Sequence, residues 1–220
     1  MRNNAKNLKL PCVVVLAAAV MVVAASLDQL NAETIALSNL PGSGTYIYGE
    51  ILTSVNWEAV GLTTDTSAET FVSLVGQFAG GFAGGVVEGG IYSDSNNSPG
   101  TLLAAFNAVT VPAFVEGSYP VTTTSPYTMQ PSTPYWFVLH DPIQFPFNWE
   151  IDDAGSGFGT VPTPASGYSF NGYENSGNAG LTWVFDTSNY AVQISTAAAV
   201  PEPGTLLLVT IGALGLIGCR

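Results

Sequence analysis

Short apolar runs separated by turn-forming residues constrain the fold of this chain more than any other feature. Between Glu33 and Ala197, β-branched and aromatic residues occur in short runs, with clusters of Gly, Pro, Ser and Asn between them. Such runs suit strands and the clusters suit tight turns, whereas no helical periodicity is sustained. We therefore predict an all-β domain over 33–197, with strands near 46–51, 70–78, 86–92, 101–106, 117–122, 135–140, 147–151, 182–185 and 191–195.

About nine short strands with turns between them favour two antiparallel sheets packed face to face, a jelly-roll-like β-sandwich. One run has apolar residues on both faces. Tyr135, Phe137 and Leu139 alternate with Trp136 and Val138. Because successive strand residues point to opposite faces, this run is predicted to be a central strand buried on both sides.

The basic residues occur only near the ends of the chain, at Arg2, Lys6, Lys9 and Arg220, and the net charge is -12. Nucleic-acid binding needs cations against phosphates, and phosphoryl transfer normally needs a Lys or Arg clamp. The sequence therefore excludes nucleic acid as a partner. Cys12 and Cys219 lie in the terminal apolar segments, so the domain between them has no disulfide or thiolate site.

The N-terminus has the order of a secretion signal. Basic residues come first, the apolar run Val13–Ala25 follows, and small residues come next. The run has signal-peptide length and is short for a membrane span. We predict a signal peptide over 1–32, with cleavage after Ala32 or after Ala25. A retained N-terminal anchor is the alternative.

The C-terminus combines a proline motif with an apolar segment. Pro201, Glu202 and Pro203 resist helix formation, Leu206–Cys219 is apolar, and Arg220 ends the chain. As a helix, the apolar segment would span only about 21 Å at about 1.5 Å per residue. A bilayer core is about 30 Å thick. The segment 200–220 is thus predicted to hold a short transmembrane helix that acts as a processing signal.

This tail resembles the PEP-CTERM sorting signal of Gram-negative bacteria, with Pro201, Glu202 and Pro203 in the motif and Arg220 at the basic end. The family usually ends in several Arg residues, and here there is one. The resemblance implies export through the inner membrane and processing by an exosortase. It also implies placement in the cell envelope, at the surface or outside the cell, and a link to exopolysaccharide or biofilm.

A second resemblance covers about 77–153. The segments Gly90–Asp94 and Ser98–Leu103 resemble the "IYSD…PGTLL" part of the choice-of-anchor R domain. The segment Pro131–Leu139 is similar to its "T-x-YW-x-VL" strand. This resemblance implies a β-sandwich and supplies no catalytic residue.

Oxygen-bearing residues recur at alternate positions in one predicted turn. Asp94, Asn96 and Ser98 have the spacing of calcium ligands. However, Pro99 stands where an EF-hand needs glycine, and no bidentate Glu follows. The pattern therefore favours a turn in which side chains bond their own backbone, with calcium as the alternative and no other cofactor expected.

The sequence shows no catalytic grouping. Asp152 and Asp153 are neighbours, so on a strand their side chains would point apart, and with Glu150 they fit a solvated loop better than a glycosidase pair. His140 is the only histidine, which excludes multi-histidine zinc sites, and no G-x-S-x-G elbow is present. We predict that the chain is not an enzyme and that His140 is structural or merely exposed.

Aromatic side chains supply the remaining candidate site. Flat rings suit sugar stacking, although a Trp beside aliphatic residues usually packs in the core. We expect Trp136 in the core, and we take Trp149 and Trp183, which lie nearer polar residues, as the candidate glycan contacts. The leading hypothesis is a structural or adhesive surface protein. The alternatives are a carbohydrate-binding module and, more weakly, a secreted glycoside hydrolase.

Overall fold

The computed structural model describes residues 32–40, 46–47, 49–143, 147–152 and 158–199. The predicted signal peptide and the sorting tail with Pro201, Glu202, Pro203 and Arg220 lie outside these residues, as do the helices expected there. Within the described ranges, no helix is long and apolar enough to cross a membrane.

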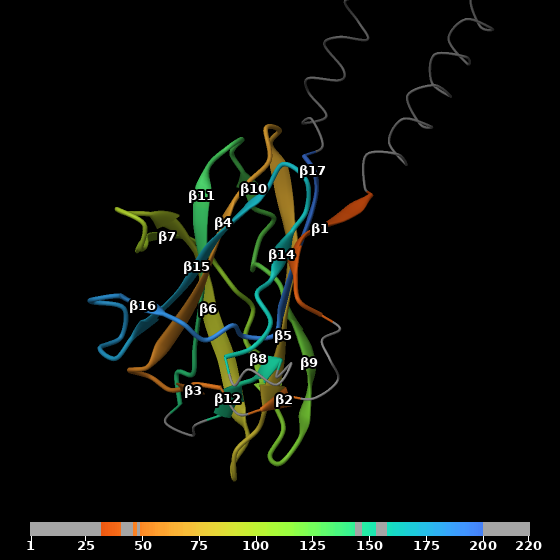
Figure 1. Ribbon diagram of the computed structural model, residues 1–220. Helices are drawn as coiled ribbons and strands as arrows, with labels where there is room; N and C mark the ends of the chain where they lie inside the picture. Colours follow the sequence, from red (N-terminus) through yellow and green to blue (C-terminus); the bar gives the residue numbers. More distant parts are fainter. Residues whose placement is uncertain (1–31, 41–45, 48, 144–146, 153–157, 200–220) are drawn as a thin grey trace, which may run out of the picture.

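The described residues form two main antiparallel sheets and a short two-stranded pair (Figure 1). The first sheet contains β1 (Glu33–Ser38), β3 (Ile51–Leu52), β5 (Glu69–Ala79), β9 (Glu116–Val121), β10 (Thr128–Met129), β12 (Phe147–Trp149), β14 (Thr163–Pro164) and β17 (Val192–Ala198). The second sheet contains β4 (Trp57–Thr63), β6 (Gly85–Asp94), β7 (Pro99–Ala105), β8 (Val109–Val111), β11 (Pro134–His140), β15 (Ser169–Ser176) and β16 (Val184–Asp186). β2 (Tyr46–Ile47) pairs with β13 (Ile151–Asp152).

The predicted all-β, sandwich-like architecture is confirmed. The main core lies between the two sheets, where Phe78 from β5 and Phe137 from β11 belong to one buried cluster. β11 lies between β4 and β6, and its five central residues are all buried. Tyr135, Phe137 and Leu139 join the main core, whereas Trp136 and Val138 belong to a separate cluster on the other face. The predicted two-faced burial of this strand is therefore correct.

Three strands of the second sheet were not predicted, namely β4, β8 and β15. β4 and β15 pair with each other, and β4 also pairs with β11. β4 contains Glu58 and Gly61, and β15 is largely polar, so neither has the apolar alternation of a half-buried strand. The predicted strand near 46–51 is divided into β2 and β3, and that near 147–151 into β12 and β13.

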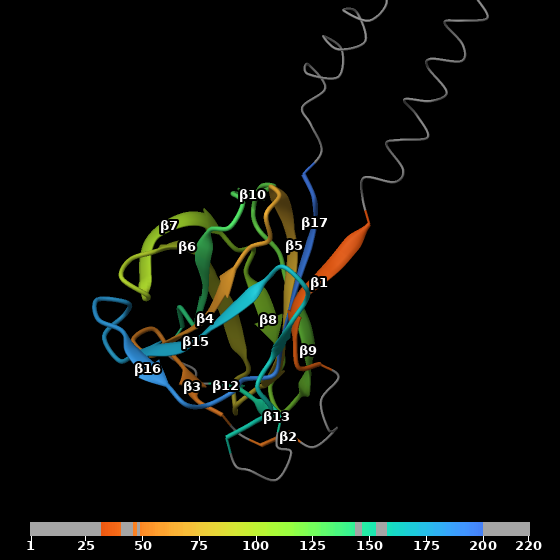
Figure 2. The ribbon, with the colours of Figure 1, turned by 45° about the horizontal axis from the view of Figure 1, so that its top comes forward.

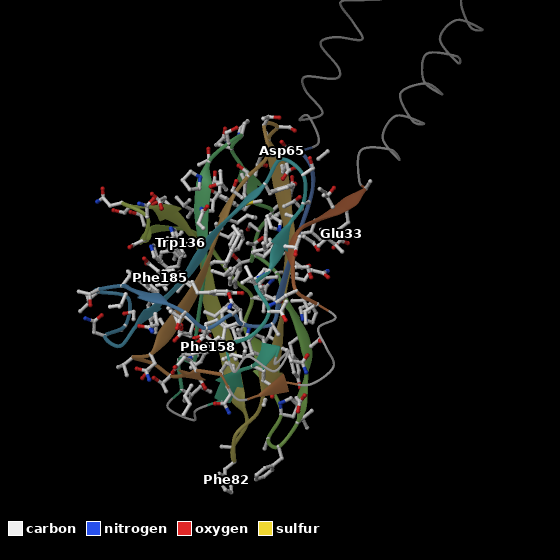
Figure 3. The ribbon with its side chains drawn as sticks, viewed as in Figure 1. Glu33, Asp65, Phe82, Trp136, Phe158 and Phe185 are labelled. Carbon is white, nitrogen blue, oxygen red and sulfur yellow. The ribbon has the colours of Figure 1, made fainter. Side chains whose placement is uncertain are left out.

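The strands place the two ends of the domain together. β1 and β17 are antiparallel neighbours, with Glu33 opposite Ala197. The β5–β6 turn lies elsewhere, and Figure 3 shows Phe82 at the lower tip of the molecule. The first and last strands of the described domain therefore lie side by side.

Candidate functional site

A layer of aromatic side chains covers the outer face of the second sheet, and we call it the aromatic face. Its buried centre is Ala59, Trp136 and Val138, against which Trp57, Tyr92 and Trp183 pack while remaining partly exposed. Small residues beneath the rings make this possible. An ideal Cβ on Gly61 would lie only 3.0 Å from the Trp136 ring, so a larger residue there would displace the indole.

The rim of the aromatic face is only partly covered. Trp57 stacks on His140, with ring centroids 4.4 Å apart and planes 17° from parallel. Burial lowers the pKa of His140, which favours the neutral imidazole. Phe185 on β16 pairs with Glu174 on β15 and is 66% exposed. Figure 3 shows Phe185 and Trp136 on the same side of the molecule. These partly exposed rings offer flat apolar faces on which a sugar ring could stack.

The turn between β6 and β7 lies against this face. Asn96 and Asn97 have φ of 59° and 63°, and the Ser95 amide donates to the Ser98 carbonyl at 2.8 Å. Positive φ at both central residues is the signature of a type I′ hairpin. Figure 2 shows this hairpin bending toward the β15–β16 hairpin. The sequence prediction of a hydrogen-bonded turn is confirmed.

The side chains of the turn are engaged within the protein. Trp136 Nε1 donates to Asp94 Oδ1 at 2.9 Å, and the Asn97 amide donates to Asp94 Oδ2 at 3.3 Å. The Ser98 hydroxyl donates to Glu174 Oε1 at 3.0 Å. Asp94, Asn96 and Ser98 therefore act in turn geometry and packing. Among the residues that the structure describes, no group of three or more His, Cys, Asp or Glu could hold a metal ion.

Glu174 connects the turn to β15. The residue is buried, and its Oε2 has no hydrogen-bond partner. Burial raises the pKa of Glu174, and the nearby carboxylate of Asp94 raises it further. The described part of the chain holds no Lys or Arg, so no cationic side chain is present to neutralise this carboxyl group.

Trp149 is not part of the aromatic face, and its assignment as a glycan contact must be corrected. Its ring is fully buried between the sheets, where it stacks on Tyr190 with centroids 4.8 Å apart. Its Nε1 donates to the Ala191 carbonyl at 3.0 Å. The polar neighbours in the sequence point away from the ring because strand residues alternate. Trp183, in contrast, lies on the aromatic face as a partly buried ring.

A second polar site lies where β4 meets the segment after β16. Glu58 is only 2% exposed. The Tyr190 hydroxyl lies 3.2 Å from Glu58 Oε2 and 2.5 Å from Asp186 Oδ2. Burial raises the pKa of Glu58 to about 9, and the carboxylates of Asp186 and Glu50 add to the shift. Glu58 is therefore a neutral carboxyl group at neutral pH.

A polar pocket of about 160 Å³ opens beside Glu58, and its wall is formed by Glu50, Asn56, Glu58, Asn175, Ser176 and Gly177. The sequence did not single out Glu58, since a lone glutamate between Trp57 and Ala59 has no motif. The pocket is lined by acceptors and amides and has no cation.

Glu150 is a further correction. Expected in a solvated loop, it is only 2% exposed, and its amide donates to the Gln77 carbonyl at 2.9 Å. Burial raises the pKa of Glu150 to about 7, and the carboxylate of Glu116 adds to the shift. Because the Glu150 backbone pairs with β5, its carboxyl group lies against the first sheet. Asp152 lies in β13, and Asp153 lies outside the described residues.

Together, the two antiparallel sheets define the class of the described domain as an all-β, sandwich-like protein. The sorting end of the chain is defined by comparison with protein families, since a model of the PEP-CTERM protein-sorting motif matches residues 199–220. The chain therefore carries this motif, which implies export, exosortase processing and a location at the cell surface or outside the cell. The comparison with curated proteins gave no match.

Proposed function

We propose that this chain is an exported surface protein whose β-sandwich has a structural or adhesive role in the extracellular matrix, linked to exopolysaccharide or biofilm. The observation that carries the proposal is the junction between domain and motif. β17 ends at Ala198, and the sorting motif begins at residue 199. In the chain, the sorting motif therefore follows directly from a strand of the first sheet.

We also propose that the domain is related to the choice-of-anchor R family. The support is spatial as well as sequential. The three segments that carry the resemblance lie on β6, β7 and β11, and these are adjacent strands in the order β11-β6-β7. Segments that resemble one family and also pair with one another support the relationship more strongly than any one segment alone.

The sorting part is tested by Glu202→Ala, with Glu116→Ala as a matched control because Glu116 is an exposed glutamate of the domain. In wild type and control, we expect the tail to be lost from the mature mass and the protein to reach the surface fraction. In the Glu202→Ala variant, the tail should be retained. Equal retention in all three, or no effect of deleting the exosortase, would contradict the proposal.

The matrix role is tested in cells that lack the gene. Attached biomass should fall and should return when the wild-type chain is supplied, but not when the Glu202→Ala chain is supplied. Unchanged biomass in the deletion strain would rule out the matrix role while leaving the sorting result intact.

A carbohydrate-binding module is the second candidate, and the aromatic face favours it. Trp57 and Trp183 remain partly exposed beside the exposed ring of Phe185. With no Lys or Arg in the domain, neutral polysaccharides are the expected ligands, because anionic ones would be repelled. A glycan array with the mature chain should show binding that Trp183→Ala removes and Phe82→Ser, at the far end, leaves intact. Binding that both variants leave unchanged would exclude the aromatic face.

The proposal includes no enzymatic activity. A glycosidase needs two opposed carboxyl groups that a sugar can reach. Glu58 and Asp186 both contact the Tyr190 hydroxyl, but Glu58 is almost completely buried. Hydrolysis of a polysaccharide that Glu58→Gln abolishes would overturn this part of the proposal.

A further inference from the structure

Three carboxyl groups lie among the rings of the aromatic face, and two of them adjoin its buried centre. Glu174 on β15 lies directly opposite Ala59 on β4. Asp94 on β6 accepts the hydrogen bond of Trp136 Nε1 at 2.9 Å. Because Ala59 and Trp136 belong to the buried centre of the aromatic face, both acids lie on the outer side of the second sheet.

The third carboxyl group lies further along β6, away from Asp94. Glu88 is half-buried and lies directly opposite His140, the residue on which Trp57 stacks. Burial lowers the pKa of His140 by more than the carboxylate of Glu88 raises it. His140 is therefore mainly neutral at neutral pH and does not balance the charge of Glu88.

Glu174 shows most clearly that the charge on this face is not balanced from within the domain. Its side chain is 8% exposed, its Oε1 accepts from the Ser98 hydroxyl, and its Oε2 has no hydrogen-bond partner. The sequence has no Lys or Arg between Glu33 and Ala198. A buried carboxylate without an opposite charge is costly, so a cation supplied by a ligand would stabilise it.

We propose that the aromatic face binds a polysaccharide whose sugars carry free, protonated amino groups. The partly exposed rings of Trp57 and Trp183 stack on the sugar rings, while Glu174 and the other two acids of the face attract the amines. Aromatic faces also attract a cation placed over them. This inference rests on the carbohydrate-binding function proposed as the second candidate and narrows its substrate class.

The position of Glu174 near a sheet edge gives such a ligand a way in. β15 is the second strand of its sheet, and the edge strand β16 beside it has only three residues. Phe185, the residue of β16 that pairs with Glu174, is largely exposed. Movement of this short edge strand is enough to open the carboxyl group to a ligand.

Other occupants fit the aromatic face less well. Among the described residues, no three acids or histidines converge as a single metal ion requires. Carboxyl groups that are spread among rings suit an extended ligand with several charges. Anionic polymers are repelled by the net charge of -12. A lysine-rich peptide would supply the charge but has no sugar rings to stack, and it is therefore one arm of the test.

The test titrates the mature chain with a β-1,4-linked glucosamine oligomer, and with the fully N-acetylated oligomer of the same length. Acetylation removes the positive charges and keeps the sugar rings. The free-amine oligomer should bind the wild type about tenfold more tightly, or by about 1.4 kcal/mol. This advantage should shrink as the salt concentration rises, because salt screens attraction between charges.

Matched variants assign the advantage to named side chains. Glu174→Gln should remove most of it while leaving binding of the acetylated oligomer unchanged, and Glu88→Gln should remove a smaller part. Trp183→Ala should weaken binding of both oligomers. Glu116→Gln removes an exposed carboxyl group from the first sheet and should have no effect. A cooperative urea transition in each variant shows that it is folded.

Several outcomes overturn the inference. Equal binding of the two oligomers would do so while leaving a carbohydrate-binding function intact. An equal loss in Glu116→Gln and Glu174→Gln would mean attraction by net charge alone. An oligolysine that binds as tightly as the amine oligomer, and with the same dependence on Glu174, would assign the face to a cationic peptide. Binding of neither oligomer also contradicts the inference, and the glycan array then decides separately whether the face binds another carbohydrate.

Discussion

A buried tryptophan and buried carboxyl groups lie on each side of the second sheet, but the two sides bury them differently. Between the sheets, Trp149 stacks on Tyr190, whose hydroxyl contacts the carboxyl groups of Glu58 and Asp186. On the aromatic face, Trp136 donates to Asp94, and Ser98 donates to Glu174. Trp149 is enclosed by two sheets, whereas Trp136 is enclosed by one sheet, three half-exposed rings and a hairpin turn.

The difference shows that burial in this fold has two origins. The main core is buried because both sheets exclude water from it, so its side chains cannot move without opening the sandwich. The aromatic face is buried by side chains at the edge, which can rearrange individually. A ligand could thus reach the aromatic face through local movement but not the main core. Four predictions test this contrast.

The largest expected effect is the loss of a tryptophan. Trp149→Ala should lower the free energy of unfolding by about 5 kcal/mol, the upper part of the range for such substitutions. Trp136→Ala should lower it by about 3 kcal/mol, because Trp57 and Trp183 can move into the space. Urea unfolding measures both. Equal losses would mean that the aromatic face is packed as rigidly as the main core.

The second prediction concerns the buried glutamates and pH. The folded chain holds a proton on Glu58 more tightly than the unfolded chain does, so stability should fall as pH rises from about 4.5 through the folded-state pKa of about 9. One pKa unit corresponds to about 1.4 kcal/mol, so the fall is expected to be on the order of a few kcal/mol. Glu58→Gln should remove most of the fall between pH 7 and 9.

Glu174→Gln is the matched variant on the aromatic face. The pKa of Glu174 is also raised, chiefly by burial, so the sign of the effect is the same. The effect should be smaller, because edge side chains can admit water to an ionised carboxylate. Urea midpoints of the wild type, Glu58→Gln and Glu174→Gln at pH 5, 7 and 9 show which glutamate contributes more to the pH dependence of stability. Stability that rises with pH in the wild type would contradict both assignments.

The sequence predicted the main core better than the aromatic face. The alternation in Tyr135–Leu139 was enough to place both faces of β11, because strand geometry fixes side-chain direction. The covering of Trp136 was not predictable, since it depends on Trp57, Trp183 and the turn at Asp94 meeting over one sheet. Which of these residues come together depends on the order of the strands in the sheet, and no local sequence pattern specifies that order.

The same limit explains the errors over individual residues. Trp149 and Trp183 both have polar residues nearby in the sequence, but the pairing of β12 with β5 places Trp149 inside. Glu58 is recognisable as a buried acid only through Tyr190, which lies 132 positions away in the chain. Contacts between residues far apart in the chain set the surroundings of the tryptophans and carboxyl groups in both regions. The turn at Asn96 and Asn97, in contrast, is local and was predicted.

The third prediction weakens the link between the turn and the aromatic face. Asp94→Ala removes acceptors from Trp136 Nε1 and from the Asn97 amide, so the free energy of unfolding should fall by about 1–3 kcal/mol. Asp94→Asn keeps an acceptor and should cost less. The near-UV circular dichroism signal should also change, because the Trp136 indole loses the hydrogen bond that fixes its orientation. A rise in melting temperature with calcium that Asp94→Ala abolishes would restore the calcium interpretation of this turn.

The smallest expected effect tests whether the turn itself sets the position of the hairpin. Asn97 has φ of 63° at the second central position of the type I′ turn, where glycine is the most favourable residue. Asn97→Gly should therefore raise the free energy of unfolding by about 0.5 kcal/mol, and Asn97→Val should lower it by more, because a β-branched residue resists positive φ. If both changes leave the urea midpoint unaltered, the turn is held by Asp94 and Ser98 alone. Its covering of Trp136 would then depend on the side-chain bonds and not on backbone geometry.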